Sequence, residues 1–239
     1  MRFQLENQSI NVVWVAPISP ELFMPSWFKQ FDLLRDEDID QAKVAIKDNE
    51  VIVDFGWFEL KAEPNRVVFK LARVGLEQTY IDLITSILTL LKNIPTAAIG
   101  INLNYFYSFN TREDWDKIGN ELVPKLLWKE ENKSKLLQDS DIEYHYGMKR
   151  LDIEIANSNK NKDKLDYYET INLTLIPHLH FDNIPFGLVS NFNHNLRSKD
   201  DPDSIEMTEI AAKVLDSQIR SAIENDINTI ESIYNRILS

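Results

Sequence analysis

The sequence predicts an α+β protein with antiparallel sheets in two halves, each covered by a helix, and a long helix that closes the chain. Runs rich in β-branched and aromatic residues follow one another with turn residues between them, which is typical of antiparallel sheets. Apolar residues spaced three to four positions apart, the period of a helix, appear only between these strand-like runs or after the last of them. The final stretch, from Ile205 to Leu238, contains neither proline nor glycine and predicts one uninterrupted helix.

The first half, residues 1–128, is predicted to begin with a short strand over residues 12–15, which ends before Pro17. Residues 19–49 show no sustained period and predict a loop with one short helix. The β-branched and aromatic runs over residues 51–60 and 66–74 predict a hairpin, because the residues between them have turn chemistry. Strict alternation of apolar residues over 97–109 predicts a further strand.

Two helices are predicted in the same half. Apolar residues three to four positions apart indicate a helix over residues 80–92, which Pro95 cannot continue. Thr111 precedes Asp114 by three residues, an approximate capping box, and a helix over residues 112–128 follows, with Pro124 as a kink or break.

The second half, residues 129–239, begins with a charged linker over 129–141 and continues as a three-stranded meander. Its strands are expected over residues 144–156, 167–179 and 184–192. The closing helix, of about 34 residues, would be about 51 Å long at 1.5 Å per residue. The two halves share one order of elements, which is compatible with a duplication, and they can also form one domain together.

Composition excludes several classes of function. The 239 residues include no cysteine, which rules out disulfides and thiolate chemistry and fits a cytoplasmic protein. No apolar run approaches the roughly 18 residues of a membrane span, so no membrane association is expected. The net charge of −12 argues against direct nucleic-acid binding. Phosphate-cradling glycine loops and GxSxG elbows are absent from the sequence, and no catalytic residue is predicted.

The segment with the clearest chemistry is His178-Leu-His-Phe-Asp182. Two histidines two residues apart in a strand project to one face and can bind one metal ion. His178, His180 and Asp182 would supply two nitrogens and one oxygen to Zn, Mn or Fe, and the metal would activate water for hydrolysis. The alternative interpretation needs no cofactor: the three residues form the polar face of an ordinary strand.

The final helix carries an apolar stripe that includes Ile219, Ile223, Ile227, Ile230 and Tyr234. Packing across the chain's own sheets is one interpretation of this stripe. The other is that part of it binds a partner protein or a second copy of the chain.

The order of elements, together with the strand entry Ile99-Gly-Ile-Asn-Leu-Asn-Tyr105, resembles a sporadically distributed family of bacterial proteins of about this length. The resemblance covers the layout of most of the chain. It implies a mobile accessory gene whose product acts beside another protein in defence or toxin neutralisation, and it implies no catalytic residues. The sequence therefore favours a non-enzymatic interaction protein, with a metal-dependent hydrolase as the alternative.

Overall fold

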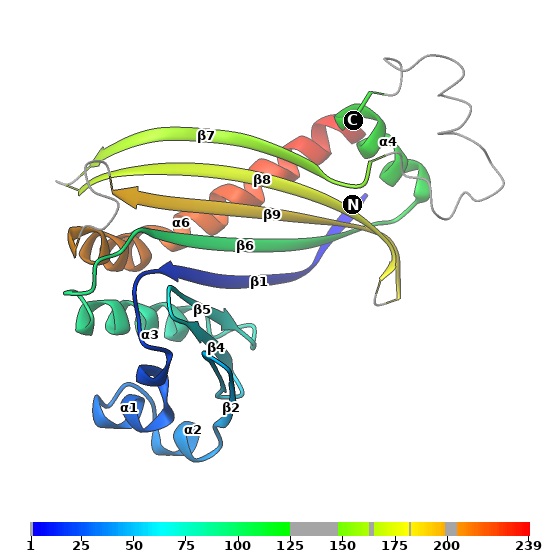
Figure 1. Ribbon diagram of the computed structural model, residues 1–239. Helices are drawn as coiled ribbons and strands as arrows, with labels where there is room; N and C mark the ends of the chain where they lie inside the picture. Colours follow the sequence, from blue (N-terminus) through cyan, green and yellow to red (C-terminus); the bar gives the residue numbers. More distant parts are fainter. Residues whose placement is uncertain (1, 125–147, 163–164, 182, 199–204) are drawn as a thin grey trace.

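The computed structural model describes residues 2–124, 148–162, 165–181, 183–198 and 205–239. These residues form a nine-stranded antiparallel sheet in the order β2-β3-β4-β5-β1-β6-β9-β8-β7 (Figure 1). The strands are β1 (Phe3–Val15), β2 (Lys43–Lys47), β3 (Glu50–Asp54), β4 (Phe58–Glu63), β5 (Arg66–Leu71), β6 (Ala98–Phe109), β7 (Leu151–Lys162), β8 (Leu165–Phe181) and β9 (Ile184–Ser198).

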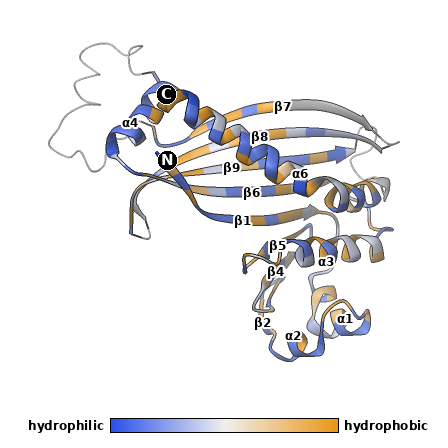
Figure 2. Cartoon of the chain, turned by 180° about the vertical axis from the view of Figure 1, so that it is seen from behind, coloured by the Kyte–Doolittle hydropathy of each residue, from blue (hydrophilic) through white to orange (hydrophobic). Residues whose placement is uncertain are grey.

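Helices cover one face of this sheet. The described helices are η1 (Pro20–Phe23), α1 (Pro25–Gln30), α2 (Asp36–Asp40), α3 (Glu77–Leu90), α4 (Arg112–Leu122) and α6 (Ile205–Leu238). Helix α6 runs obliquely across the long strands, in front of them in Figure 2, and packs against α3, α4 and strands β6, β8 and β9. The long helix therefore covers the core side of β6, β8 and β9.

The core is organised in rows that cross the sheet through paired residues. One row on the helix-covered face runs from Val53 through Leu60, Phe69 and Val12 to Ile101. These five side chains are at most 3% exposed. In β6 buried and half-buried residues alternate without exception from Ala98 to Phe109, as the period of a strand requires. The apolar alternation in the sequence thus identifies the face that the helices cover.

The opposite face of the long strands is polar, and no described helix covers it. Asn193 Nδ2 donates to Asn102 Oδ1 at 2.7 Å, and Asn102 Nδ2 donates to Asn11 Oδ1 at 2.8 Å. A second ladder runs beside the first, from Asn191 through Asn104 to Ser9. Side-chain amides therefore bridge three neighbouring strands, and each half-buried amide finds a hydrogen-bond partner.

The α+β class predicted from the sequence is confirmed, but the strands form one sheet where two were expected. Strand β6, from the first half, pairs with β9, from the second, over ten residue pairs between Ile99 and Ser108. Residues 1–128 and 129–239 consequently share one sheet. The helix over 205–238 has the expected bounds, and Thr111 Oγ1 accepts a hydrogen bond from Asp114 N at 3.1 Å as the capping pattern predicts.

Several boundaries differ from those expected. Strand β1 begins at Phe3 and not near residue 12, because its largely polar first part also pairs with β6. Strand β2 lies inside the segment predicted to be a loop. The strand predicted over 51–60 is divided at Gly56, whose φ of 83° makes a turn that favours glycine. Helix α4 ends at Leu122, just before Pro124, and residues 125–128 lie outside the described part.

Among the described residues, no helix is long and apolar enough to cross a membrane.

Candidate functional site

The residues predicted to bind metal are only partly described. His178 lies in β8, where it pairs with Gly187. Its ring meets the Phe106 ring edge-on, with 6.2 Å between the two ring centroids. His180 is also in β8, but its side chain lies outside the described part, as does all of Asp182. Among the side chains that are described, no group of three His, Cys, Asp or Glu residues could hold a metal ion. The metal site stays a prediction.

The predicted partner-binding stripe of α6 faces the chain's own sheet. Ile219, Ile230 and Tyr234 are between 0% and 3% exposed, and Tyr234 shares a hydrogen bond of 2.8 Å with Ser190 of β9. Ile223 and Ile227 are half-buried at the edge of the same interface. A partner could reach the three buried side chains only if α6 left the sheet.

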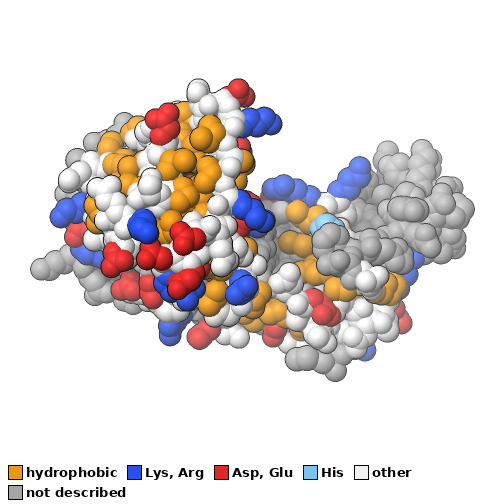
Figure 3. All heavy atoms as spheres, turned by 90° about the horizontal axis from the view of Figure 1, so that it is seen from below, with side chains coloured by type: hydrophobic (Ala, Val, Ile, Leu, Met, Phe, Trp, Pro, Cys, Tyr) orange, Lys and Arg blue, Asp and Glu red, His pale blue; other side chains and the backbone are white. Residues whose placement is uncertain are grey.

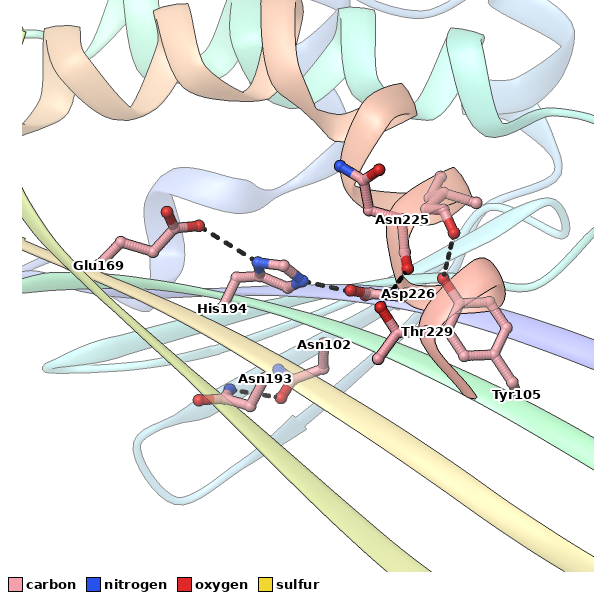
Figure 4. A network of polar contacts seen from close by, with 9 residues as sticks. Asn102, Tyr105, Glu169, Asn193, His194, Asn225, Asp226 and Thr229 are labelled. Carbon is pink, nitrogen blue, oxygen red and sulfur yellow. Dashed lines mark hydrogen bonds and ion pairs between the residues drawn. The ribbon is translucent and has the colours of Figure 1, made fainter. Parts of the chain in front are cut away.

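A charged network lies beneath α6 at a position that the sequence analysis did not select. His194 of β9 is held between two carboxylates (Figure 4). Its Nδ1 is 3.2 Å from Glu169 Oε1 on β8, and its Nε2 is 3.0 Å from Asp226 Oδ2 on α6. The three side chains, named here the buried triad, are between 6% and 12% exposed.

The surroundings of the buried triad determine its protonation. Burial alone would lower the pKa of His194, but hydrogen bonds to Asp226 and Glu169 outweigh burial and raise this pKa to about 9. Burial raises the pKa of Asp226, and the contact with His194 offsets part of that increase. His194 therefore carries its proton at neutral pH and donates both ring N–H groups.

This arrangement limits the chemistry that His194 can perform. A general base needs an unprotonated ring nitrogen that can accept a proton from the substrate. Both nitrogens of His194 already donate to carboxylates, and the raised pKa keeps them protonated. The buried triad consequently suits structural or binding roles better than hydrolysis.

A cavity of about 230 Å³ adjoins the buried triad. Glu169, His194 and Asp226 line it together with aliphatic side chains of the sheet and of α6. Asn225 and Thr229 lie on the exposed side of α6 beside the cavity, and Thr229 Oγ1 donates to the Asn225 carbonyl at 2.7 Å (Figure 4). The cavity therefore combines an apolar wall with one charged side.

The sequence did contain signals for the buried triad. His194 alternates with Phe192 and Leu196, both fully buried, so the strand period places it on the core face. Asp226 lies three residues after Ile223 and four before Ile230, so the helical period places it within the apolar stripe. His194 thus occupies an apolar position of the strand period, and Asp226 occupies an apolar position of the helical period. A polar residue at such a position is the sequence signal for a buried polar contact.

The outer edge of β2 is the second unusual feature of the fold. All five residues from Lys43 to Lys47 are exposed, and β2 is the terminal strand of the sheet. Val44 pairs with Val53 and Ile46 pairs with Val51, so both continue the apolar face of the sheet. Their side chains are nevertheless 40% and 66% exposed, because no described helix extends over them.

Comparison with protein-family models found no match for the chain, and comparison with curated proteins found none either.

Proposed function

We propose that the protein is a non-enzymatic interaction protein, a subunit or neutralising partner in a bacterial multi-protein system, and that it binds an extended segment of its partner along β2. The proposal rests on one observation: Val44 and Ile46 extend the apolar face of the sheet beyond its helical cover, on an edge strand. The likeness of element order to a bacterial family of accessory proteins supports the biological setting.

An exposed edge strand offers two kinds of contact. The unpaired backbone N–H and C=O groups on its outer side can pair with another strand, a mode that supplies affinity in many peptide-binding domains. Side chains at alternate positions supply specificity, and here they are Val44 and Ile46 on one face and Lys43 and Lys47 on the other. Hydrophobic side chains reach the surface of the lobe that carries α1, α2 and β2, among acidic and basic ones (Figure 3).

The charges of β2 indicate what the partner strand contains. Its inner neighbour β3 places Asp54 opposite Lys43 and Glu50 opposite Lys47, with Val51 and Val53 between the two acids. Within the described part of the chain neither lysine forms an ion pair, and Glu50 is bound instead by Lys61 at 2.6 Å. A partner strand with the pattern of β3, acidic at both ends and apolar at alternate positions, would complement the outer edge in the same way.

A second copy of the chain fits this edge less well. If two β2 strands paired antiparallel about Ala45, Lys43 of each copy would lie opposite Lys47 of the other. Like charges opposite each other across strands are destabilising. The edge is therefore better suited to a different protein than to a homo-oligomer.

The proposal is tested with peptides that stand in for the partner. Two capped peptides, Glu-Val-Ile-Val-Asp and Lys-Val-Ile-Val-Lys, are titrated into the full chain while NMR records the β2 amides. Each cross-strand charge pair contributes about 0.2–1 kcal/mol, so changing two pairs from attractive to repulsive gives about 0.8–4 kcal/mol, a preference of about four-fold or more for the acidic peptide. Ile46→Asp should abolish the binding.

Charge variants supply the control. Lys43→Glu with Lys47→Glu should reverse the preference, so that the basic peptide binds more tightly. Lys92→Glu with Arg236→Glu makes the same change of net charge at exposed positions of other elements and should leave the preference unchanged. Equal affinities for the two peptides, or shifts that map away from β2, would show that the edge is not the docking site.

A further inference from the structure

A cleft of about 720 Å³ lies beside the first half of α3. Residues of three segments line it: the stretch 32–41 that contains α2, the turn 55–57 with the nearby Arg73, and the stretch 76–86 of α3. Helix α3 lies above α2 in Figure 1. Small-molecule sites have volumes of about 300–1,000 Å³, so the cleft is large enough for a ligand.

The beginning of α3 offers hydrogen-bond donors to this cleft. Leu76 occupies the N-cap position without a side-chain acceptor, and Tyr80 N donates to Leu76 O at 2.9 Å. The N–H groups of Glu77, Gln78 and Thr79 find no acceptor in the described part of the chain. Because Leu76 and Thr79 line the cleft, these N–H groups lie at its border. Free N–H groups in the first turn of a helix attract an anion.

Trp57 and Arg73 add two side-chain donors. Trp57 is 7% exposed, and its Nε1–H neither donates to a described residue nor is enclosed by the protein. Arg73 forms no hydrogen bond or ion pair with any residue that the structure describes. The two residues are close in space, because Ala72 N donates to Trp57 O at 2.9 Å. A largely buried indole N–H normally has an acceptor, so this pair indicates that a ligand supplies one.

Most charged side chains of the cleft already have a partner. Arg35 donates to both carboxylate oxygens of Asp38, at 3.0 and 3.2 Å, and its charge also attracts Glu37. Asp82 Oδ1 accepts from Gln78 Nε2 at 2.6 Å. These contacts account for four of the six charged side chains that line the cleft.

The two remaining charged residues have opposite signs. They are Asp32 and Arg73, and neither side chain has a partner among the described residues. Asp32 belongs to the stretch around α2, whereas Arg73 lies beside Trp57 and shortly before α3. A ligand with one negative and one positive group would satisfy both.

The uncharged lining suits a ligand with an aliphatic chain. Leucines from two of the three segments contribute to it, namely Leu33, Leu34, Leu76 and Leu83. Methylene groups that pack against these leucines lose contact with water, which favours binding. The neutral polar residues of the lining are Gln41, Thr79 and Ser86.

We propose that the cleft binds a lysine-type ligand, in which an aliphatic chain joins a carboxylate to an ammonium group. The carboxylate accepts from Trp57 Nε1, from the Arg73 guanidinium and from the first turn of α3, and the ammonium group donates to Asp32. Free lysine and the C-terminal lysine of a polypeptide share this chemistry. The inference does not depend on the partner strand proposed for β2.

The test titrates three probes of the same shape into the full chain. Nα-acetyl-lysine carries both charged groups, Nα-acetyl-lysine amide lacks the carboxylate, and N-acetyl-norleucine lacks the ammonium group. The NMR signal of the Trp57 indole N–H reports binding. The indoles of Trp14 and Trp115, which donate to Thr96 Oγ1 and to Gly187 O, are internal controls.

Nα-acetyl-lysine should bind saturably, shift the Trp57 signal, and bind roughly tenfold or more tightly than either other probe, because each of those loses a charge-assisted contact. Free lysine, as a fourth probe, distinguishes the two sources. Tighter binding of free lysine than of Nα-acetyl-lysine indicates an amino-acid site, and the reverse indicates a site for a chain terminus.

Two variants separate the two ends of the site. Arg73→Gln should remove the preference for Nα-acetyl-lysine over its amide and keep the preference over N-acetyl-norleucine. Asp32→Asn should do the opposite. Arg66→Gln, at an exposed position of β5 outside the cleft, should keep both preferences. Asp48→Asn should keep them too; it is matched to Asp32→Asn, since the φ angles of Asp48 and Asp32 are 52° and 55°.

Three outcomes would overturn the proposal. Equal binding of the three probes would show that charge does not select the ligand. A Trp57 indole signal that stays in place at saturating Nα-acetyl-lysine would place the carboxylate elsewhere. Equal weakening of all three probes by Arg73→Gln would show that Arg73 supports the fold and does not bind the carboxylate.

Discussion

Replacing His194 by glutamine should remove a pH dependence from the stability of the protein. The side chain of His194 is 6% exposed and lies between the carboxylates of Glu169 and Asp226. These contacts raise its pKa in the folded chain to about 9 from the ordinary 6.5. Proton binding by His194 is therefore linked to folding.

The direction in which stability changes with pH follows from whether the folded chain, the unfolded chain or both hold the proton of His194. Below pH 6.5 the folded and the unfolded chain both hold it, and the stabilisation is complete. Between pH 6.5 and about 9 only the folded chain holds it, so the free energy of unfolding falls by about 1.4 kcal/mol per pH unit. The two pKa values differ by about 2.5 units, which gives a loss of about 3 kcal/mol by pH 9.5.

Urea denaturation of the wild type and of His194→Gln across pH 6 to 10 measures this contribution. The difference in unfolding free energy between the two proteins should be largest at pH 6 and should shrink by about 3 kcal/mol as the pH rises to 10. His178→Gln is the matched control, because it removes a histidine outside the buried triad. A difference that stays constant with pH would refute the charged state assigned to His194.

Three further predictions concern other parts of the chain. Gly187→Ala should lower the free energy of unfolding by about 1–3 kcal/mol, because a Cβ there would lie 2.5 Å from the Phe106 ring; adding Phe106→Ala should relieve the loss in the same denaturation assay. Thr111→Ala should cost about 1 kcal/mol by removing the cap of α4, as measured by thermal unfolding; Thr111→Ser should retain most of the stability. If the predicted metal site exists, purified protein carries near-stoichiometric Zn, Mn or Fe by elemental analysis and His180→Ala loses it; metal-free wild type would contradict it.

The parts of the fold that the sequence predicted are those encoded by local periodicity. Helix α6 and strand β6 were placed within a residue of their observed ends because their apolar periods run unbroken over many turns or pairs. Strand β2 was missed because its alternation of apolar and polar residues is only five residues long and lies in a segment that has no sustained period. The polar start of β1 was missed because Gln4, Glu6, Asn7 and Gln8 leave it without apolar alternation, although this part of the strand pairs with β6.

The joining of the two halves and the buried triad depend on contacts between distant residues. The pairing of Ile99 with Leu196 brings together residues far apart in the chain, and no local pattern specifies it. His194 and Asp226 each break an apolar pattern, but only the packing of α6 on β9 shows that they meet. The period of a strand or helix can therefore indicate that a polar residue lies on a core face. It cannot identify the hydrogen-bond partner of that residue, which depends on tertiary packing.

The most direct test of the proposed interaction is hydrogen exchange of the β2 amides in the full chain, with and without the peptide Glu-Val-Ile-Val-Asp. A bound strand would pair with the outward-facing N–H groups of residues 43–47, so exchange at alternate amides of this segment should slow when the peptide is present. The remaining amides should keep their rates. Unchanged exchange in β2 at saturating peptide, or slowing confined to another element, would contradict a partner-binding role for this edge.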